Sequence, residues 1–120
     1  MNEGLKQGIK EFMLSGSMAE TKGLLISACD NYFKALIHAI DLSLFEKIGK
    51  IPDSHTERFR ILENENKELY NLVDPLFNLY RKSYRSSVTK EEFNRIKNGL
   101  KKTLELTKLE KEFIGYLQGG

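Results

Sequence analysis

The segment from residue 20 to residue 48 constrains the fold most, because its apolar side chains cover more than half of a helix. When these residues are placed at about 100° each, as in an α-helix, the apolar positions form one wide arc. The arc holds Leu24, Leu25, Ala28, Cys29, Tyr32, Phe33, Ala35, Leu36, Ala39, Ile40, Leu42 and Leu44. A helix with so wide an apolar face must be covered on most sides, so we expect it to be the central helix of a bundle.

The remaining arc of this helix, roughly 100° wide, is a narrow polar stripe. It consists of Ser27, Asp30, Asn31, Lys34, His38 and Asp41. One interpretation is a solvated side with an ordinary Asp30–Lys34 ion pair and a structural, hydrogen-bonded His38. The other is a groove for a ligand or a dimer mate, because so many bulky residues around one helix imply more neighbours than one small bundle supplies.

Composition supports an all-α fold in a single domain spanning residues 1–120. The chain has seventeen Leu but only two Val and two Pro, and β-branched residues favour strands whereas Pro interrupts helices. Its length and 40% hydrophobic content fit one core. We therefore predict an up-and-down bundle of four to five helices, in which short connectors make neighbouring helices antiparallel.

Capping patterns predict where the first helices begin and end. A short first helix has apolar residues at positions 5, 9, 12 and 13, and the glycine-containing segment 15–17 closes it. Ser17 and Glu20 have the spacing of a capping box and are expected to begin the central helix, which tolerates Gly23 near its start.

The same capping spacing occurs twice more. Ser54 and Glu57, after a loop at 49–53, predict the start of the third helix. Thr89 and Glu92 predict the start of the last helix, which is expected to continue to residue 117. Between them, Asp74-Pro75 either kinks the third helix or ends it so that a fourth begins, and the sequence leaves both alternatives open.

Positive charge gathers in the C-terminal third of a chain whose net charge is only +2. Residues 79–102 carry a net charge of +6, whereas residues 1–78 have 9 basic and 12 acidic side chains. Arg81, Tyr84 and Arg85 interleave guanidinium groups with an aromatic ring, a combination that stacks on a base and contacts phosphate. These three residues, with Lys34 and His38 of the stripe, are the candidate nucleotide-binding or RNA-binding residues.

Several classes of site are missing from the sequence. It has no phosphate-binding glycine loop, no nucleophile elbow and no metal-binding motif, so no catalytic residue, metal or cofactor is predicted. A single cysteine, Cys29, cannot form an internal disulfide, which favours a reducing, cytoplasmic setting. No segment has the length of apolar residues that a membrane helix needs, and the N-terminal residues lack the order of a signal peptide, so neither secretion nor membrane insertion is expected.

Five parts of the chain follow one another as a recognisable series of helix and turn motifs. An Ala-containing helix with an aromatic pair leads through a glycine turn to a Pro-x-x-His segment, and an Arg-containing helix end then precedes a capped final helix. These motifs lie at residues 31–39, Gly49, residues 51–55, residues 79–85 and residues 88–93. In this order they resemble the landmarks of the HEPN superfamily (higher eukaryotes and prokaryotes nucleotide-binding).

The resemblance implies a helical bundle that is usually a homodimer and binds nucleotide or RNA, often beside a minimal nucleotidyltransferase partner in toxin–antitoxin pairs. Ribonuclease members carry an Arg followed within about one and a half helical turns by a His. Arg81 matches that Arg, but no His follows it here, which removes the obvious general acid or base. Only Arg81 carries over, as a possible phosphate contact.

Three hypotheses follow. The leading one is a non-catalytic, dimeric HEPN-like module that binds nucleotide, RNA or a partner protein through Arg81, Arg85 and Lys34. The second is a ribonuclease in which His38 or His55 replaces the missing histidine through space. The third is a purely structural dimerisation scaffold.

Overall fold

The computed structural model describes residues 2–117, and in this range the chain is helical, with no β-strand. The elements are α1 (Glu3–Thr21), α2 (Leu25–Ile48), α3 (His55–Glu65), α4 (Lys67–Lys82), α5 (Lys90–Leu106), α6 (Glu110–Phe113) and a 3-10 turn at Ile114–Tyr116. The predicted all-α class is therefore confirmed. The described residues form six helices where four to five were expected, and the sixth is only four residues long.

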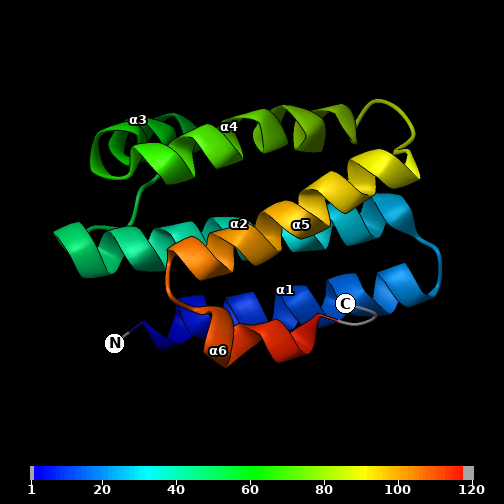
Figure 1. The fold of residues 1–120 in the computed structure, drawn as a ribbon, viewed down its shortest axis with the longest axis horizontal. Helices are drawn as coiled ribbons and strands as arrows, with labels where there is room; N and C mark the ends of the chain where they lie inside the picture. The colour runs from blue at the N-terminus through cyan, green and yellow to red at the C-terminus, as the bar shows by residue number, and fades with distance from the viewer. Residues whose placement is uncertain (1, 118–120) are drawn as a thin grey trace.

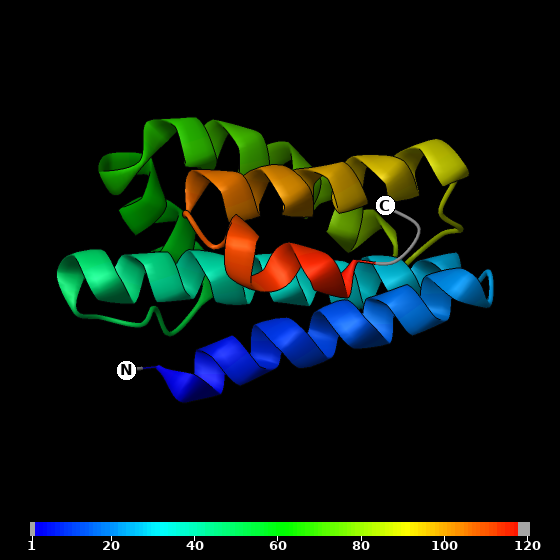
Figure 2. The same cartoon turned by 60° about the horizontal axis from the view of Figure 1, so that its bottom comes forward.

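The four long helices, α1, α2, α4 and α5, run in alternating directions along the chain (Figure 1). The helix α2 packs against α1 along one side and against α5 and α4 elsewhere. The helix α3 precedes α4 in the outer layer, and α6 with its 3-10 turn folds back beside α1 (Figures 1 and 2). The predicted central position of residues 20–48 is thus confirmed for α2.

The burial of α2 is completed within one chain. Its apolar arc is covered from Ala28 to Leu44, and Tyr32, Phe33 and Leu36 are almost fully buried. The expectation that this helix needs more neighbours than one bundle supplies is therefore wrong, because α1, α4 and α5 are sufficient. Leu24 departs from the predicted arc: it precedes the first turn of α2 and is 54% exposed.

The first helix ends at Thr21 and not at the predicted segment 15–17. Gly16 lies inside α1, where a Cβ would come within 2.4 Å of the Tyr32 ring, so its glycine allows close helix packing and marks no turn. Gly23 makes the turn instead, with φ +76°, and the amides of Gly23 and Leu24 bond back to Glu20 and Ala19 in a Schellman motif.

The predicted capping pair of Ser17 and Glu20 has another role inside the bundle. Ser17 is buried and donates to the Tyr116 carbonyl at 2.8 Å, which holds the C-terminal turn on α1. The Glu20 carboxylate accepts from the Tyr32 hydroxyl at 2.7 Å and from Lys97 at 2.9 Å, joining α1 to α2 and α5. A local sequence pattern was therefore overridden by contacts between helices.

The two other predicted N-caps are confirmed. Ser54 accepts from the Glu57 amide before α3, and Thr89 forms a complete capping box with Glu92 before α5. The boundary between α3 and α4 lies at Asn66, whose side chain caps α4, and Pro75 lies inside α4. The alternative in which a helix ends at residues 74–75 is therefore wrong.

The last helix does not continue to residue 117. It ends at Leu106, and Lys108 adopts φ +62° while the Leu109 amide bonds to the Leu104 carbonyl at 2.8 Å. This is a second Schellman motif, built on a lysine rather than a glycine, which explains why the sequence did not reveal it. The chain then turns back, and Lys6 of α1 pairs with Glu112 of α6 at 3.4 Å.

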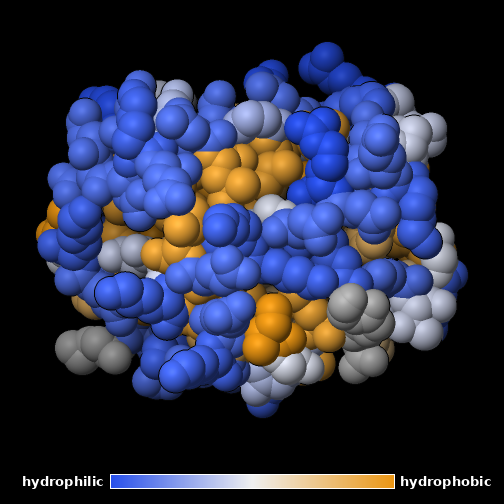
Figure 3. All heavy atoms as spheres, viewed as in Figure 1, coloured by the Kyte–Doolittle hydropathy of each residue, from blue (hydrophilic) through white to orange (hydrophobic). Residues whose placement is uncertain are grey.

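The face that carries α5 is largely hydrophilic, with apolar atoms at the bottom of a hollow between α4 and α5 (Figure 3). This hollow has a volume of about 450 Å³, and its lining includes Leu72, Leu76 and Arg95. Among residues 2–117, no helix combines the length and the apolar character that crossing a bilayer requires.

The turn at Gly23 and the helical position of Gly4 predict opposite effects for the same substitution at the two glycines. Gly23→Ala is expected to lower the free energy of unfolding by about 1 kcal/mol, because alanine is strained at positive φ. Gly4→Ala, at an open position of α1, is expected to raise it by up to about 1 kcal/mol, because alanine favours a helix. Urea unfolding monitored by circular dichroism measures both, and a neutral Gly23→Ala variant would contradict the assigned turn.

Candidate functional site

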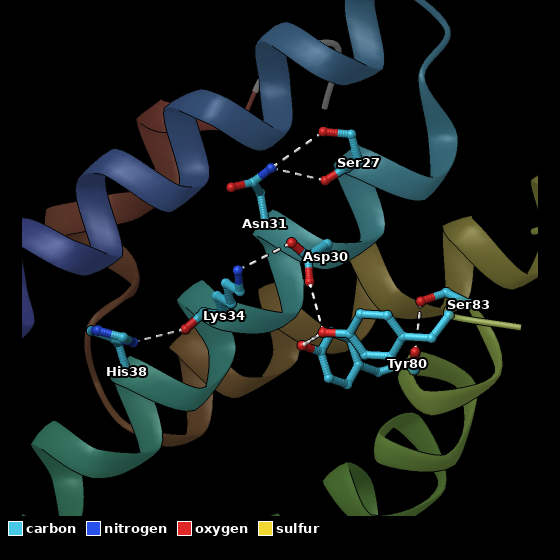
Figure 4. A network of polar contacts seen from close by, with 8 residues as sticks. Ser27, Asp30, Asn31, Lys34, His38, Tyr80 and Ser83 are labelled. Carbon is cyan, nitrogen blue, oxygen red and sulfur yellow. Dashed lines mark hydrogen bonds and ion pairs between the residues drawn. The ribbon is translucent and has the colours of Figure 1, made fainter.

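The polar side chains of the α2 stripe lie on the side of the helix between α1 and α4 (Figure 4), where a cavity lined by Lys34 and His38 opens. Asn31 bonds to the Ser27 carbonyl, and Lys34 pairs with Asp30 at 3.2 Å, as the spacing predicted. The Lys34 side chain is 45% exposed and lies 5.7 Å from the centre of the Phe12 ring of α1. The stripe is thus partly accessible from Ser27 to His38.

His38 is held in one tautomer at the end of this stripe. Its Nδ1 lies 3.0 Å from the Lys34 carbonyl oxygen, which can only accept, so Nδ1 carries the hydrogen. The ring packs edge-on against Phe12, and a Cβ on Gly8 would lie 2.5 Å from it. His38 is therefore fixed by α1 on one side and by its own helix on the other.

Asp41 does not belong to the accessible stripe, which corrects the prediction. It is 5% exposed and forms two parallel hydrogen bonds with Arg58 of α3, at 2.6 and 2.8 Å. Such a fork-to-fork pair satisfies both charges away from water and anchors α3 on α2. The sequence placed Asp41 with the other polar residues because periodicity alone does not show where α3 lies.

His55, at the start of α3, receives a hydrogen bond from the same arginine. Its Nδ1 lies 2.8 Å from Arg58 Nη1, and because a guanidinium only donates, Nδ1 must accept. Burial, with a smaller contribution from the nearby Arg58 charge, lowers the pKa of His55 below the usual 6.5. His55 is therefore a neutral imidazole at pH 7, with its hydrogen on Nε2.

One cavity of about 320 Å³ brings these side chains together. Lys34, His38 and His55, which are separated in the sequence, line it with apolar and aromatic side chains from α1, α2 and α4. The complete lining is Phe12, Phe33, Lys34, Ile37, His38, His55 and Tyr80. The structure thus brings the predicted site residues Lys34 and His38 together with His55, the second histidine considered for the ribonuclease alternative.

The other predicted site residues lie at the C-terminal end of α4. Arg81, Tyr84 and Arg85 line a hollow of about 510 Å³ together with Asn78 and Lys82. Arg81 lies over the Phe77 ring, 5.7 Å from its centre. Within residues 2–117, neither Arg81 nor Arg85 pairs with a carboxylate, so both charges are available to a ligand.

Tyr84 separates this basic hollow from a larger apolar one. The second hollow, of about 760 Å³, is lined by Leu24, Ile26 and Val88 as well as Tyr84. Tyr84 is 68% exposed. Its hydroxyl contacts the Tyr80 hydroxyl and, more loosely at 3.5 Å, donates to the Asp30 carboxylate. Tyr84 therefore links the basic end of α4 to the α2 groove.

The basic segment is less uniform than its sequence indicates. Lys97 points inward and pairs with Glu20, and Lys82 pairs with Glu92 of the capping box. These contacts neutralise two of the charges counted at residues 79–102. The accessible positive charge near the groove is thereby concentrated on Arg81 and Arg85.

Sequence reasoning missed the aromatic cluster that supports the site. Phe33 stacks on Tyr80 at 4.4 Å between ring centres, and Phe77 contacts His55, Phe59 and Phe33. The aromatic residues at 77 and 80 on α4, and at 84 just beyond its end, are spaced by three and four residues, which is the signal that could have identified this wall.

Chemistry that depends on a metal or a thiolate finds no site in the described part of the chain. No three His, Cys, Asp or Glu side chains of residues 2–117 gather as a metal site. Burial, with smaller contributions from Glu92 and Asp30, raises the pKa of Cys29 to about 12, so its thiol stays protonated.

Comparison of the chain with family models, characterised proteins and solved structures gives no match, and the HEPN resemblance therefore depends on the motifs alone.

The buried pair predicts a non-additive result. Arg58→Met leaves the Asp41 carboxylate buried without a partner and is expected to cost about 3–5 kcal/mol of unfolding free energy. The double variant Asp41→Leu/Arg58→Met is expected to be markedly more stable than Arg58→Met, because no charge remains buried. Lys67→Met, which breaks the exposed pair with Glu63, is the matched control and should leave stability almost unchanged. Equal loss in the single and double variants would contradict this assignment.

Proposed function

We propose that the protein is a non-catalytic, HEPN-like binding module that binds nucleotide or RNA at the C-terminal end of α4. The observation that carries this proposal is the position of Tyr84, an exposed ring between a basic hollow and an apolar hollow. A base stacks on the ring, and the phosphate it carries is held by Arg81 and Arg85.

The charges around Tyr84 support a phosphate ligand. Arg81 lies in the last turn of α4 and Arg85 in the turn that follows the helix, and both line the basic hollow. Arginine donates in a planar fork that matches phosphate oxygens, and the stacking of Arg81 over Phe77 orients that fork without neutralising it. Lys34 contributes less, because Asp30 already holds its ammonium group.

The HEPN resemblance extends the proposal to assembly. It favours a homodimer and a nucleotidyltransferase-type protein partner, as in toxin–antitoxin pairs. Because α2 is covered within one chain, a dimer would form through the outer surfaces and would add no cover to α2. Sedimentation at several concentrations distinguishes this arrangement from a monomer.

Binding of a fluorescently labelled single-stranded RNA tests the proposal. Arg81→Ala and Arg85→Ala are each expected to weaken binding and to reduce the slope of log K against log salt by about 0.7. Tyr84→Ala is expected to cost about 1–3 kcal/mol and Tyr84→Phe much less, because a phenyl ring still stacks. Arg60→Ala removes an exposed arginine of α3 and is the matched control.

A salt-independent interaction, or equal losses in Arg60→Ala and Arg81→Ala, would show that the α4 end is no phosphate site. Binding that survives Tyr84→Ala unchanged would remove the base-stacking part of the proposal. Each variant should first be shown by circular dichroism to be folded.

A ribonuclease is the second candidate, because His38 and His55 line one cavity with Lys34. Cleavage of RNA requires a base and an acid with pKa values near neutrality. The lowered pKa of His55, caused mainly by burial, keeps it neutral and makes it a poor acid at pH 7. The non-catalytic function is therefore favoured.

Incubation with single-stranded RNA at pH 7 distinguishes the two functions. We expect no cleavage by the wild-type protein beyond that of a preparation of the His38→Ala/His55→Ala variant. Cleavage that is lost in His38→Ala, His55→Ala and Arg81→Ala, with retained folding, would instead establish the ribonuclease function.

A further inference from the structure

The cavity between α1, α2 and α3 has hydrogen-bond donors on its wall but no carboxylate. Its charged or polar lining side chains are Lys34, His38, His55 and Tyr80. A neighbouring carboxylate, Asp30, pairs with Lys34 from outside this lining, and the other, Asp41, is occupied by Arg58. His38 uses its Nδ1–H on the Lys34 carbonyl, so in this tautomer its Nε2 accepts, and the donors left for a ligand are those of Lys34 and His55. The Lys34 and His55 side of the cavity is therefore suited to a ligand group that accepts hydrogen bonds.

The buried ion pair determines which donor His55 presents. Asp41 holds Arg58 with two hydrogen bonds, and Arg58 in turn donates to His55 Nδ1 at 2.8 Å. This leaves Nε2–H as the free donor of a ring that lines the cavity, and no acceptor among residues 2–117 bonds to it. The chain of hydrogen bonds from Asp41 through Arg58 to His55 thus fixes His55 Nε2–H as an uncharged donor.

The size and the walls of the cavity limit its ligand to a small, flat molecule. Its volume of about 320 Å³ is at the lower end for ligand pockets, which span roughly 300–1,000 Å³. Phe12, Phe33 and Ile37 supply the apolar walls, and Phe33 is backed by the stacked Tyr80 ring. Such walls favour an aromatic body.

The charge of the cavity matches a single negative charge. Lys34 is its one permanent cation, and Asp30 already neutralises part of that charge. A dianion would be poorly compensated here, whereas a carboxylate can accept from Lys34 and from His55 Nε2–H.

We propose that this cavity is a second ligand site, separate from the RNA site at Tyr84, and that it binds a small flat monoanion such as an aromatic carboxylate. The carboxylate lies toward Lys34 and His55, and the ring lies between Phe12 and Phe33. His55 acts as a specificity-determining donor, and Arg58 positions it.

Benzoate is the probe. Benzamide, which keeps the flat ring but has no charge, and cyclohexanecarboxylate, which keeps the charge but has no flat ring, are the matched controls. Binding is followed by nuclear magnetic resonance through amide shifts and the ring nitrogens of His55. We expect saturable benzoate shifts at α1, α2 and His55, and affinity at least about tenfold higher than for benzamide, because a charged hydrogen bond is lost. Cyclohexanecarboxylate should bind more weakly than benzoate.

Two variants are expected to weaken benzoate binding and a third to strengthen it. Lys34→Met and His55→Phe are each expected to weaken benzoate binding about tenfold, since each removes one donor. Asp30→Asn is expected to strengthen it, because Lys34 is released from its partner. Arg85→Ala, which changes the basic hollow but not the lining of this cavity, should leave benzoate binding unchanged, and benzoate should not displace RNA. This site and the proposed function can therefore fail separately.

The proposal is overturned if benzoate shifts do not saturate, if benzamide binds equally well, or if Asp30→Asn weakens binding as Lys34→Met does. Shifts confined to Arg81 and Arg85 would likewise show that benzoate is only a counterion at the basic hollow. Nitrogen chemical shifts that place the hydrogen of His55 on Nδ1 would contradict the role of Arg58 in fixing Nε2–H as the donor.

Discussion

The burial of α2 is the constraint on which the rest of the structure depends. Because α1, α4 and α5 cover its apolar arc, the polar stripe is left on its one open side, between α1 and α4. Close packing on this helix also explains the glycines of α1: Gly8 and Gly16 lie against the His38 and Tyr32 rings, where a Cβ would collide. The groove beside the polar stripe therefore results from the same helix packing that forms the core.

Two kinds of polar contact organise the molecule around that helix. Asp41 and Arg58 are buried together, and Lys97 is buried against the half-buried Glu20. Both pairs connect helices and satisfy charges that packing takes away from water. The exposed groups, Arg81 and Arg85, lie beside aromatic rings and have no carboxylate partner among residues 2–117. This separation places the available positive charge at the α4 end, next to a groove whose cavity holds neutral and cationic donors.

The candidate site was predicted in part. Arg81, Tyr84 and Arg85 are within five residues of one another, at the last turn of α4 and in the turn that follows it, so their proximity follows from the sequence. Lys34 and His38 were also correctly predicted to lie together on the accessible stripe of α2. Asp41 lies on the same helix but is buried, because Arg58 of α3 covers that end of the stripe. The meeting of His55 with Lys34 depends on the path of the loop after α2, and no local pattern encodes that path.

The amino-acid sequence by itself determined the helical class, the central role of residues 25–48 and the caps at Ser54 and Thr89, because these depend on periodicity and on contacts within one turn. The tertiary structure alone decided that Gly16 is a packing contact and Gly23 a turn, and that a lysine at 108 reverses the chain. It also decided which charges are paired. Such outcomes depend on the distances between helices, which are set only when all the side chains of the core pack together.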